Sequence, residues 1–320
     1  MQDSPNIFDI SLSDLPWDSW IDKVDDTIVE NGFVEYLGAR HFAAFLENKP
    51  TLLVTFESYA QVQALSADGQ PMGWSLSKAL GWSTMAVVSD GDTWFRDPRV
   101  FGLFDRLIDD GFFEKFEQVL FYGAGAAGYA AAAFSVAAPG ARVLCIQPQA
   151  TLDPRVAEWD DRFLHMRRTD FDTRYGYAPD MLDAADEAFV LYDPDNKLDA
   201  MHASLFTRPN VTKFRMRHLG PNMEQSLMRM SLLLRIIAQM SAGKLHRLSL
   251  AKMFRARHQH VPYLKRVMVR LERDERLYLN ALWANHVMRR TPGPRFRKSI
   301  RFAYDKADDQ GVAMPEREFN

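Results

Sequence analysis

A glycine-rich segment carries the clearest chemical pattern in the sequence. It reads Gly123-Ala124-Gly125-Ala126-Ala127-Gly128, and it joins an apolar run over residues 119–122 to an alanine-rich stretch. As a G-x-G-x-x-G motif, its glycines would form a tight turn, admit a pyrophosphate to the backbone and place it at a helix N-terminus. This interpretation predicts a nucleotide- or phosphate-binding enzyme of the oxidoreductase class, with a nucleotide as cofactor. Against it, two predicted strands precede the motif, and residues 146–149 lack the expected ribose-binding acid.

The same segment also fits a nucleophile elbow, the strained strand-to-helix turn G-x-S-x-G with small neighbours. Residues 122–131, YGAGAAGYAA, resemble the YGSSMGGYAA segment of a bacterial α/β-hydrolase-like family that is associated with surface-polysaccharide loci. Residues 52–56 resemble the strand before the oxyanion loop of that family. Residues 90–95 resemble its (D/N)xWY turn, and residues 146–149 stand where it has SPQ. The similarity covers about residues 50–220.

The resemblance implies a catalytic triad in the chain order Ser, then Asp or Glu, then His. Asp193 follows the predicted strand over residues 188–192, and His218 follows the last predicted strand. The nucleophile position, however, holds Gly125, which has no side chain with which to form an acyl-enzyme. Cys145 lies inside a predicted strand, where we expect it to be a buried, small apolar residue. We therefore expect the fold of the family with a degenerate triad.

Polar side chains collect where the predicted strands end, and ligands of open parallel sheets bind beyond those carboxyl ends. The predicted ligand-binding residues are Gly123, Gly125, Gly128, Glu57, Asp92, Trp94, Gln147 and Gln149. Their acids, amides and indole suit a polar small molecule or a glycan. The alternative is that these residues serve turns and caps. CxxC and HExxH patterns are missing, so no metal site is predicted.

Some chains of this type carry the name phosphoadenosine phosphosulfate reductase. Such reductases resemble pyrophosphatases with an SGGKDS-like loop, and they use a cysteine near a C-terminal ECGLH. This sequence has neither feature, so its residues do not support that activity.

The elements that would position these residues alternate between strands and helices. Short apolar runs predict six strands, at residues 52–56, 85–89, 119–122, 143–146, 188–192 and 211–214. Because most runs are continuously apolar, they indicate strands buried on both faces of a mostly parallel sheet. We expect helices at 75–80, 100–116, 128–137 and 154–167 to flank it. The predicted α/β-hydrolase-like domain spans 51–221, after an N-terminal helical segment over 1–50 with helices at 17–29 and 35–48.

The C-terminal region differs from the rest in charge and pattern. Residues 1–221 hold 19 basic and 33 acidic side chains, whereas residues 222–320 hold 20 basic and 9 acidic ones. Apolar spacing predicts helices at 223–240, 245–257, 262–273 and 275–290, with a partly loose end over 291–320. We expect this basic tail to dock on its own acidic domain, on a second copy of the chain or on another anionic partner. Motifs that bind nucleic acid are missing, which argues against such a partner.

Composition narrows the function classes. The sequence has 47% hydrophobic and 25% charged residues, which is typical of a globular protein. One cysteine excludes an internal disulfide, the first ten residues lack the pattern of a signal peptide, and no apolar run approaches the ~18 residues of a membrane span. We expect a cytoplasmic, non-hydrolytic ligand-binding or accessory protein, with a link to surface-polysaccharide metabolism. The alternatives are the nucleotide- or phosphate-binding enzyme above and an interaction scaffold that acts through the basic tail.

Overall fold

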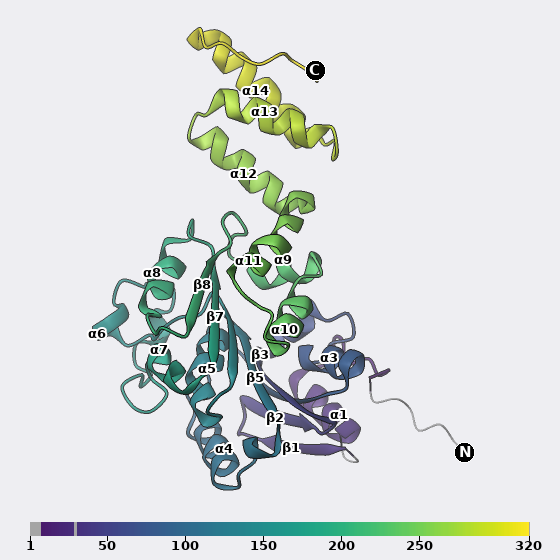
Figure 1. The fold of residues 1–320 in the computed structure, drawn as a ribbon, viewed down its shortest axis with the longest axis vertical. Helices are drawn as coiled ribbons and strands as arrows, with labels where there is room; N and C mark the ends of the chain where they lie inside the picture. The colour runs from purple at the N-terminus through teal and green to yellow at the C-terminus, as the bar shows by residue number, and fades with distance from the viewer. Residues whose placement is uncertain (1–7, 29–30, 320) are drawn as a thin grey trace.

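The computed structural model describes residues 8–28 and 31–319 of the chain, and eight strands of this part form one sheet (Figure 1). The strand order is β1-β2-β4-β3-β5-β6-β7-β8. Strands β1 and β2 pair antiparallel with their neighbours, and all pairs from β4 onwards in this order are parallel. The bounds are β1 Gly32–Tyr36, β2 His41–Leu46, β3 Lys49–Ser58, β4 Trp82–Ser89, β5 Gln118–Ala124, β6 Arg142–Ile146, β7 Glu187–Tyr192 and β8 Val211–Arg215.

All six predicted strands are present, as β3 to β8, and the prediction of a mostly parallel α/β sheet is confirmed. The apolar runs are expected to mark strands buried on both faces of the sheet. Helices do cover both faces, and β4, for example, is buried along its whole length. Cys145 in β6 is fully buried, as expected of a small apolar residue. Burial raises the pKa of its thiol.

The prediction of an N-terminal helical segment over residues 1–50 is only partly correct. Helix α1, Trp17–Ile28, matches the first predicted helix, but the predicted helix over 35–48 is wrong. That stretch contributes to β1 and β2, which pair antiparallel through a turn where Gly38 has φ +84°. All six residues of β2 are buried, so packing on both faces of the sheet overrides the helix propensity of its Ala43-Ala44 pair. The sheet therefore begins before residue 50 and has eight strands instead of six.

Helices cover the two faces of the sheet in separate groups. Helices α4, α5 and α7 share a core with one face of β3, β5, β6 and β7. Helices α1 to α3 and α9 to α11 pack on the opposite face. The bounds are α2 Tyr59–Leu65, α3 Met72–Leu80, α4 Pro98–Asp109, α5 Ala126–Phe134, α6 Pro154–Ala157, α7 Ala178–Met181, α8 Lys197–Leu205, α9 Met223–Arg229, α10 Leu233–Ser241 and α11 Arg247–Met253.

The basic C-terminal region is helical, as predicted, and it has two parts. Helices α9 to α11 lie against the sheet, whereas α12 (Val261–Arg273), α13 (Leu277–Met288) and α14 (Pro294–Gln310) extend away from it (Figure 1). The predicted helix over 223–240 breaks at Ser231, where φ is +55°. The partly loose end expected over 291–320 is helical over Pro294–Gln310, where α14 buries Phe296 and Ile300 against its neighbours, and it forms no helix or strand over 312–319. In the described residues, no helix combines the length and apolar character needed to span a membrane.

Candidate functional site

The glycine-rich segment forms a sharp turn between β5 and α5. Gly125 occupies its apex with φ 60° and ψ −123°, a conformation that only glycine adopts without strain. Its N–H donates to the Ile146 carbonyl oxygen over 2.8 Å, which ties the apex to the end of β6. The geometry is that of a strained strand-to-helix turn.

The three predicted glycines serve this turn differently. A Cβ at Gly123 would lie 2.1 Å from the Ala127 carbonyl oxygen, so the backbone of α5 excludes any side chain there. A Cβ at Gly128 would lie 3.1 Å from the Gly123 oxygen, which is tight. A Cβ at Gly125 would meet nothing within 4 Å. Gly123 and Gly128 therefore permit close packing, whereas Gly125 faces open space.

That open space is a cavity of about 330 Å³. The turn residues Ala124 and Gly125 lie on one side of it, and Gln61 of α2 and Glu224 of α9 lie on the others. A second cavity, of about 240 Å³, shares Gln61 and Glu224 and adds Glu57. The two hollows thus meet at Gln61 and Glu224, and we call them together the elbow cavity.

Glu57 and Glu224 place two carboxyl groups beside this space. Glu57 is buried, and it accepts hydrogen bonds from Thr55 Oγ1 (2.6 Å) and from the Met72 N–H (3.0 Å to Oε2). Burial raises its pKa although both hydrogen bonds act in the opposite direction. Of the predicted ligand-binding side chains, two line the elbow cavity: Glu57 lines the smaller hollow and Gln147 the larger one.

Glu224 is a buried acid that contacts two other polar side chains, Tyr122 and Gln61. Its Oε1 accepts a hydrogen bond of 2.5 Å from the Tyr122 hydroxyl, and its Oε2 lies 3.5 Å from Gln61 Nε2. Burial, assisted by the charge of Glu57, raises the pKa of Glu224 to about 7. Burial and the Glu224 charge raise the pKa of Tyr122 well above 10, so Tyr122 stays protonated and donates. At neutral pH, Glu224 can therefore either accept or donate a hydrogen bond to a bound group.

Sequence reasoning did not identify Glu224, because it lies 102 residues after Tyr122, in the region treated as a basic tail. One signal was present in the sequence. Between residues 222 and 271, Glu224 is the single acid in a stretch rich in arginine and lysine. A lone acid at the start of an amphipathic helix is a reason to look for a specific partner.

The predicted pair of Asp193 and His218 does not form. His218 Nδ1 lies 2.5 Å from Asp195 Oδ2, whereas Asp193 accepts hydrogen bonds from the Asp195 N–H (3.0 Å) and the Gly220 N–H (2.7 Å). Desolvation lowers the pKa of His218, although Asp195 acts in the opposite direction. His218 lines a different cavity from Gly125, and among the described lining residues only Pro221 faces both. The structure thus does not assemble Gly125, Asp193 and His218 into one site.

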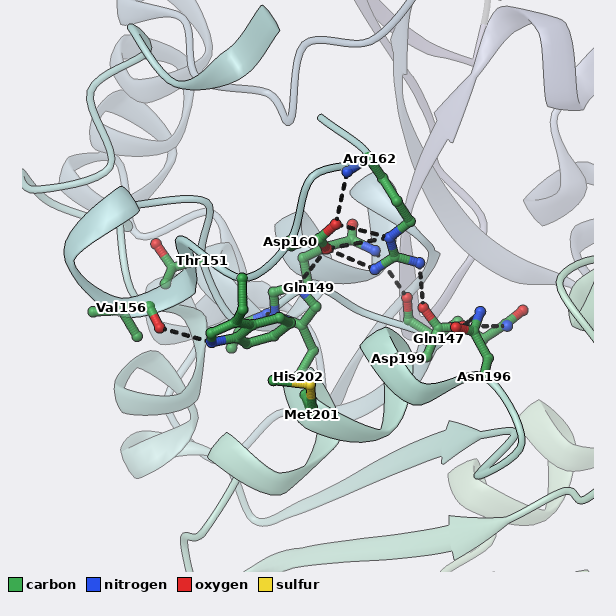
Figure 2. Close-up of polar contacts among 12 residues, drawn as sticks. Gln147, Gln149, Thr151, Val156, Asp160, Arg162, Asn196, Asp199, Met201 and His202 are labelled. Atoms are coloured by element: carbon green, nitrogen blue, oxygen red, sulfur yellow. Dashed lines mark hydrogen bonds and ion pairs between the residues drawn. The ribbon is translucent and has the colours of Figure 1, made fainter. Parts of the chain in front are cut away.

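Gln147 is committed to a buried polar network beyond the ends of β6 and β7 (Figure 2). Its Nε2 donates to Asp199 Oδ2 over 2.7 Å, and its Oε1 accepts from the Met223 N–H over 3.2 Å. In the same network, Arg162 bridges Asp160 and Asp199, and His202 Nε2 lies 2.9 Å from Asp160. Burial alone would raise the pKa of Asp160, but the hydrogen bonds from His202 and Arg162 outweigh it and hold it well below its usual value. The predicted helix over 154–167 is present only as the single turn of α6 and a 3₁₀ turn over Leu164–Met166.

The remaining predicted ligand-binding side chains, those of Trp94, Gln149 and Asp92, lie away from the elbow cavity. Gln149 Oε1 accepts a 3.1 Å hydrogen bond from the Trp94 indole, and both side chains are buried. Trp94 packs edge-on against Phe163. Asp92 is exposed, with its carboxylate 3.9 Å from His165. For these residues the alternative assignment to structural roles fits the geometry. Within the described part of the chain, no three His, Cys, Asp or Glu side chains gather as a metal site.

Comparison with known proteins adds similarity to solved structures. No protein-family model and no curated protein matches the sequence. An esterase of Pyrobaculum calidifontis matches with 12% identity and a TM-score of 0.43, over 72% of this chain and 95% of that one. Carboxyl esterase 2 of Tuber melanosporum matches with 12% identity and a TM-score of 0.41, over 63% and 85%. The capsule O-acetyltransferase of Neisseria meningitidis serogroup A matches with 14% identity and a TM-score of 0.39, over 65% and 93%.

These structural neighbours are esterases and acetyltransferases of the α/β-hydrolase fold. At such identities and TM-scores, the likeness carries no argument about activity. The fold class of this chain rests on its own eight-stranded, mostly parallel sheet with helices on both faces. The chain is thus an α/β protein with a mostly parallel sheet and helices on both faces.

Proposed function

We propose that this chain is a non-hydrolytic ligand-binding or accessory protein, which binds a polar, hydroxyl-rich ligand in the elbow cavity. One observation carries the proposal: the apex of the strand-to-helix turn is Gly125, which faces a cavity of about 330 Å³ without offering a nucleophile. Acyl transfer of the serine-hydrolase type needs a side chain at this position. The same cavity remains suitable for binding.

The groups around the cavity favour a sugar-like ligand. Glu224 can accept or donate near neutral pH, and Gln61 Nε2 is a further donor beside it, whereas Gln61 Oε1 already accepts from the Ser58 N–H and Oγ. The hydroxyl groups of a sugar can both donate and accept hydrogen bonds, so they can pair with these groups. The resemblance of the turn to a family from surface-polysaccharide loci supports a glycan unit as the ligand. The acids Glu57 and Glu224 act against the nucleotide alternative, because neither supplies the positive charge that a pyrophosphate needs, and the ionised fraction of Glu224 repels it.

The first test asks whether the wild type has serine-hydrolase chemistry. We expect neither labelling by a fluorophosphonate probe nor saturable turnover of p-nitrophenyl acetate. Labelling of the wild type, or turnover that Glu224→Gln abolishes, would contradict the absence of hydrolytic chemistry.

The second test asks whether the elbow cavity binds the ligand. Neutral oligosaccharides are screened against the full chain by saturation-transfer NMR, and hits are titrated by calorimetry. Gly125→Asn places a side chain in the cavity and should weaken binding at least tenfold. Gly140→Asn is the matched control, because Gly140 also has a positive φ (+82°) with nothing within 4 Å of its Cβ, but it lies before β6 at the opposite end of the sheet. Saturable binding of NAD or ATP without any glycan would favour the nucleotide alternative instead.

A further inference from the structure

A second and larger cavity lies where the C-terminal helices leave the sheet. It measures about 580 Å³ and opens between helix α12 and the loops that follow β7 and β8. We call it the α12 cleft. Its loop side carries Asp193, Asp195, Lys197 and His218, and its helix side carries Lys265, Arg266, Val269, Arg270 and Arg273. Figure 1 shows α12 rising from the body at the end where α9 and α11 cover the sheet.

The basic residues of α12 are spaced to act together. Arg266, Arg270 and Arg273 stand at positions i, i+4 and i+7 of the helix, so they project from one face. All three line the cleft, and Lys265 borders it beside Arg266. The helix thus presents a row of guanidinium groups to the cleft.

The cations of the cleft are only partly neutralised. Arg270 and Arg273 share one carboxylate, that of Asp274, at 2.5 and 3.2 Å. Within the described part of the chain, Lys197, Lys265 and Arg266 form no ion pair. Arg266 also has a buried Nη1 without a hydrogen-bond partner among the described residues. Its guanidinium lies so close over Gly220 that a Cβ there would be 2.6 Å from Arg266 Nε.

The acids of the loop side are already engaged with other groups. Asp193 accepts from two backbone N–H groups, and Asp195 lies 2.5 Å from His218 Nδ1. Five cations therefore stand against the three carboxylates of Asp193, Asp195 and Asp274. Desolvation lowers the pKa of His218, so this imidazole adds little positive charge at neutral pH. The cleft keeps a positive excess.

We propose that the α12 cleft binds the phosphate group of a small phosphorylated molecule. Guanidinium groups bind phosphate oxygens through paired hydrogen bonds, and ammonium groups supply charge without fixed geometry. Arg266 and Arg270, one helical turn apart, are placed to bind two oxygens of one phosphate, with Lys197 and Lys265 at its edges. The site is separate from the elbow cavity and does not depend on its proposed ligand.

The test is a calorimetric titration of the full chain with inorganic pyrophosphate. We expect saturable binding that weakens at least tenfold in Arg270→Gln and in Lys265→Gln, two exposed positions where folding should be preserved. Arg266→Gln should abolish binding, with circular dichroism as a check of folding. Arg301→Gln is the matched control, since Arg301 is exposed on α14 and lies outside the α12 cleft. It should leave the affinity unchanged.

Two results would overturn the proposal. The first is affinity for pyrophosphate that is equal in wild type, Arg270→Gln and Lys265→Gln, because the cleft would then not be the site. The second is absence of pyrophosphate binding together with co-sedimentation on vesicles of phosphatidylcholine and phosphatidylglycerol. That outcome would assign the basic face to a lipid surface instead of a small molecule.

Discussion

The raised pKa of Glu224 makes the stability of the protein depend on pH in a defined way. Its carboxyl group has a pKa near 7 in the folded chain and about 4.5 in the unfolded chain. Between these values the folded state binds the proton more tightly, so this group lowers the free energy of unfolding as pH rises. The effect is absent below pH 4.5 and complete above pH 7. At about 1.36 kcal/mol for each pH unit, it amounts to about 3 kcal/mol.

Glu224→Gln removes the charge and keeps an oxygen that can accept the Tyr122 hydrogen bond. Relative to its value at pH 4.5, the difference in unfolding free energy between variant and wild type should therefore shift by about 3 kcal/mol in favour of the variant by pH 8. Urea denaturation followed by tryptophan fluorescence at half-unit pH steps measures this difference. Comparing the two proteins also cancels most of the contribution from Glu57, whose pKa is raised in the same direction.

The matched control is Glu117→Gln, which removes an exposed glutamate just before β5, at the other end of that strand. Its difference from wild type should stay constant across the same pH range. A constant difference for Glu224→Gln as well would refute the reasoning, because Glu224 would then titrate equally in the folded and unfolded chains.

Three further outcomes follow from the geometry. Gly123→Ala should lower the free energy of unfolding by about 3 kcal/mol, because its Cβ would lie 2.1 Å from the Ala127 oxygen; a near-neutral result in urea denaturation would contradict the tight turn. Tyr122→Phe should raise the pKa of Glu224 further, since the lost hydrogen bond lowers it; carboxyl NMR titration would show an unchanged pKa if the bond were unimportant. Arg162→Leu should cost roughly 3–5 kcal/mol in thermal or urea unfolding, because it leaves buried carboxylates without their counter-charge; a loss under 1 kcal/mol would refute this role.

The sequence was sufficient for most of the sheet and failed where propensity and burial disagree. Strands β3 to β7 contain nearly continuous apolar runs of a length that suits a buried strand, so their pattern and their packing agree, whereas β8, VTKFR, is only partly buried. In β2, His41–Leu46, the run AAFL also fits a helix, and only its place between β1 and β4 makes it a strand. Long-range pairing of this kind leaves no local signal in the sequence.

In the candidate site too, the sequence predicts what neighbouring residues determine and misses what distant segments determine. The glycine turn and Glu57 were identified from local patterns, because turn glycines and strand ends are properties of neighbouring residues. Glu224 was not, since its environment is created by Tyr122 and Gln61 from distant segments. For the histidine partner, the predicted acid is Asp193, whereas the structure places Asp195, two residues further on, beside His218. Only the backbone hydrogen bonds that occupy Asp193 decide that Asp195 lies beside His218.

The buried thiol of Cys145 provides this chain with an internal reporter of its own opening. It is the single cysteine of the sequence, and it lies fully buried in the middle of the sheet. Burial also keeps its pKa high, so a thiol reagent can react only with molecules that have opened the sheet around β6. The labelling rate of the unmodified protein thus counts opening events directly. Any ligand of the folded state should slow that rate in proportion to its occupancy, so binding can be followed without an engineered probe.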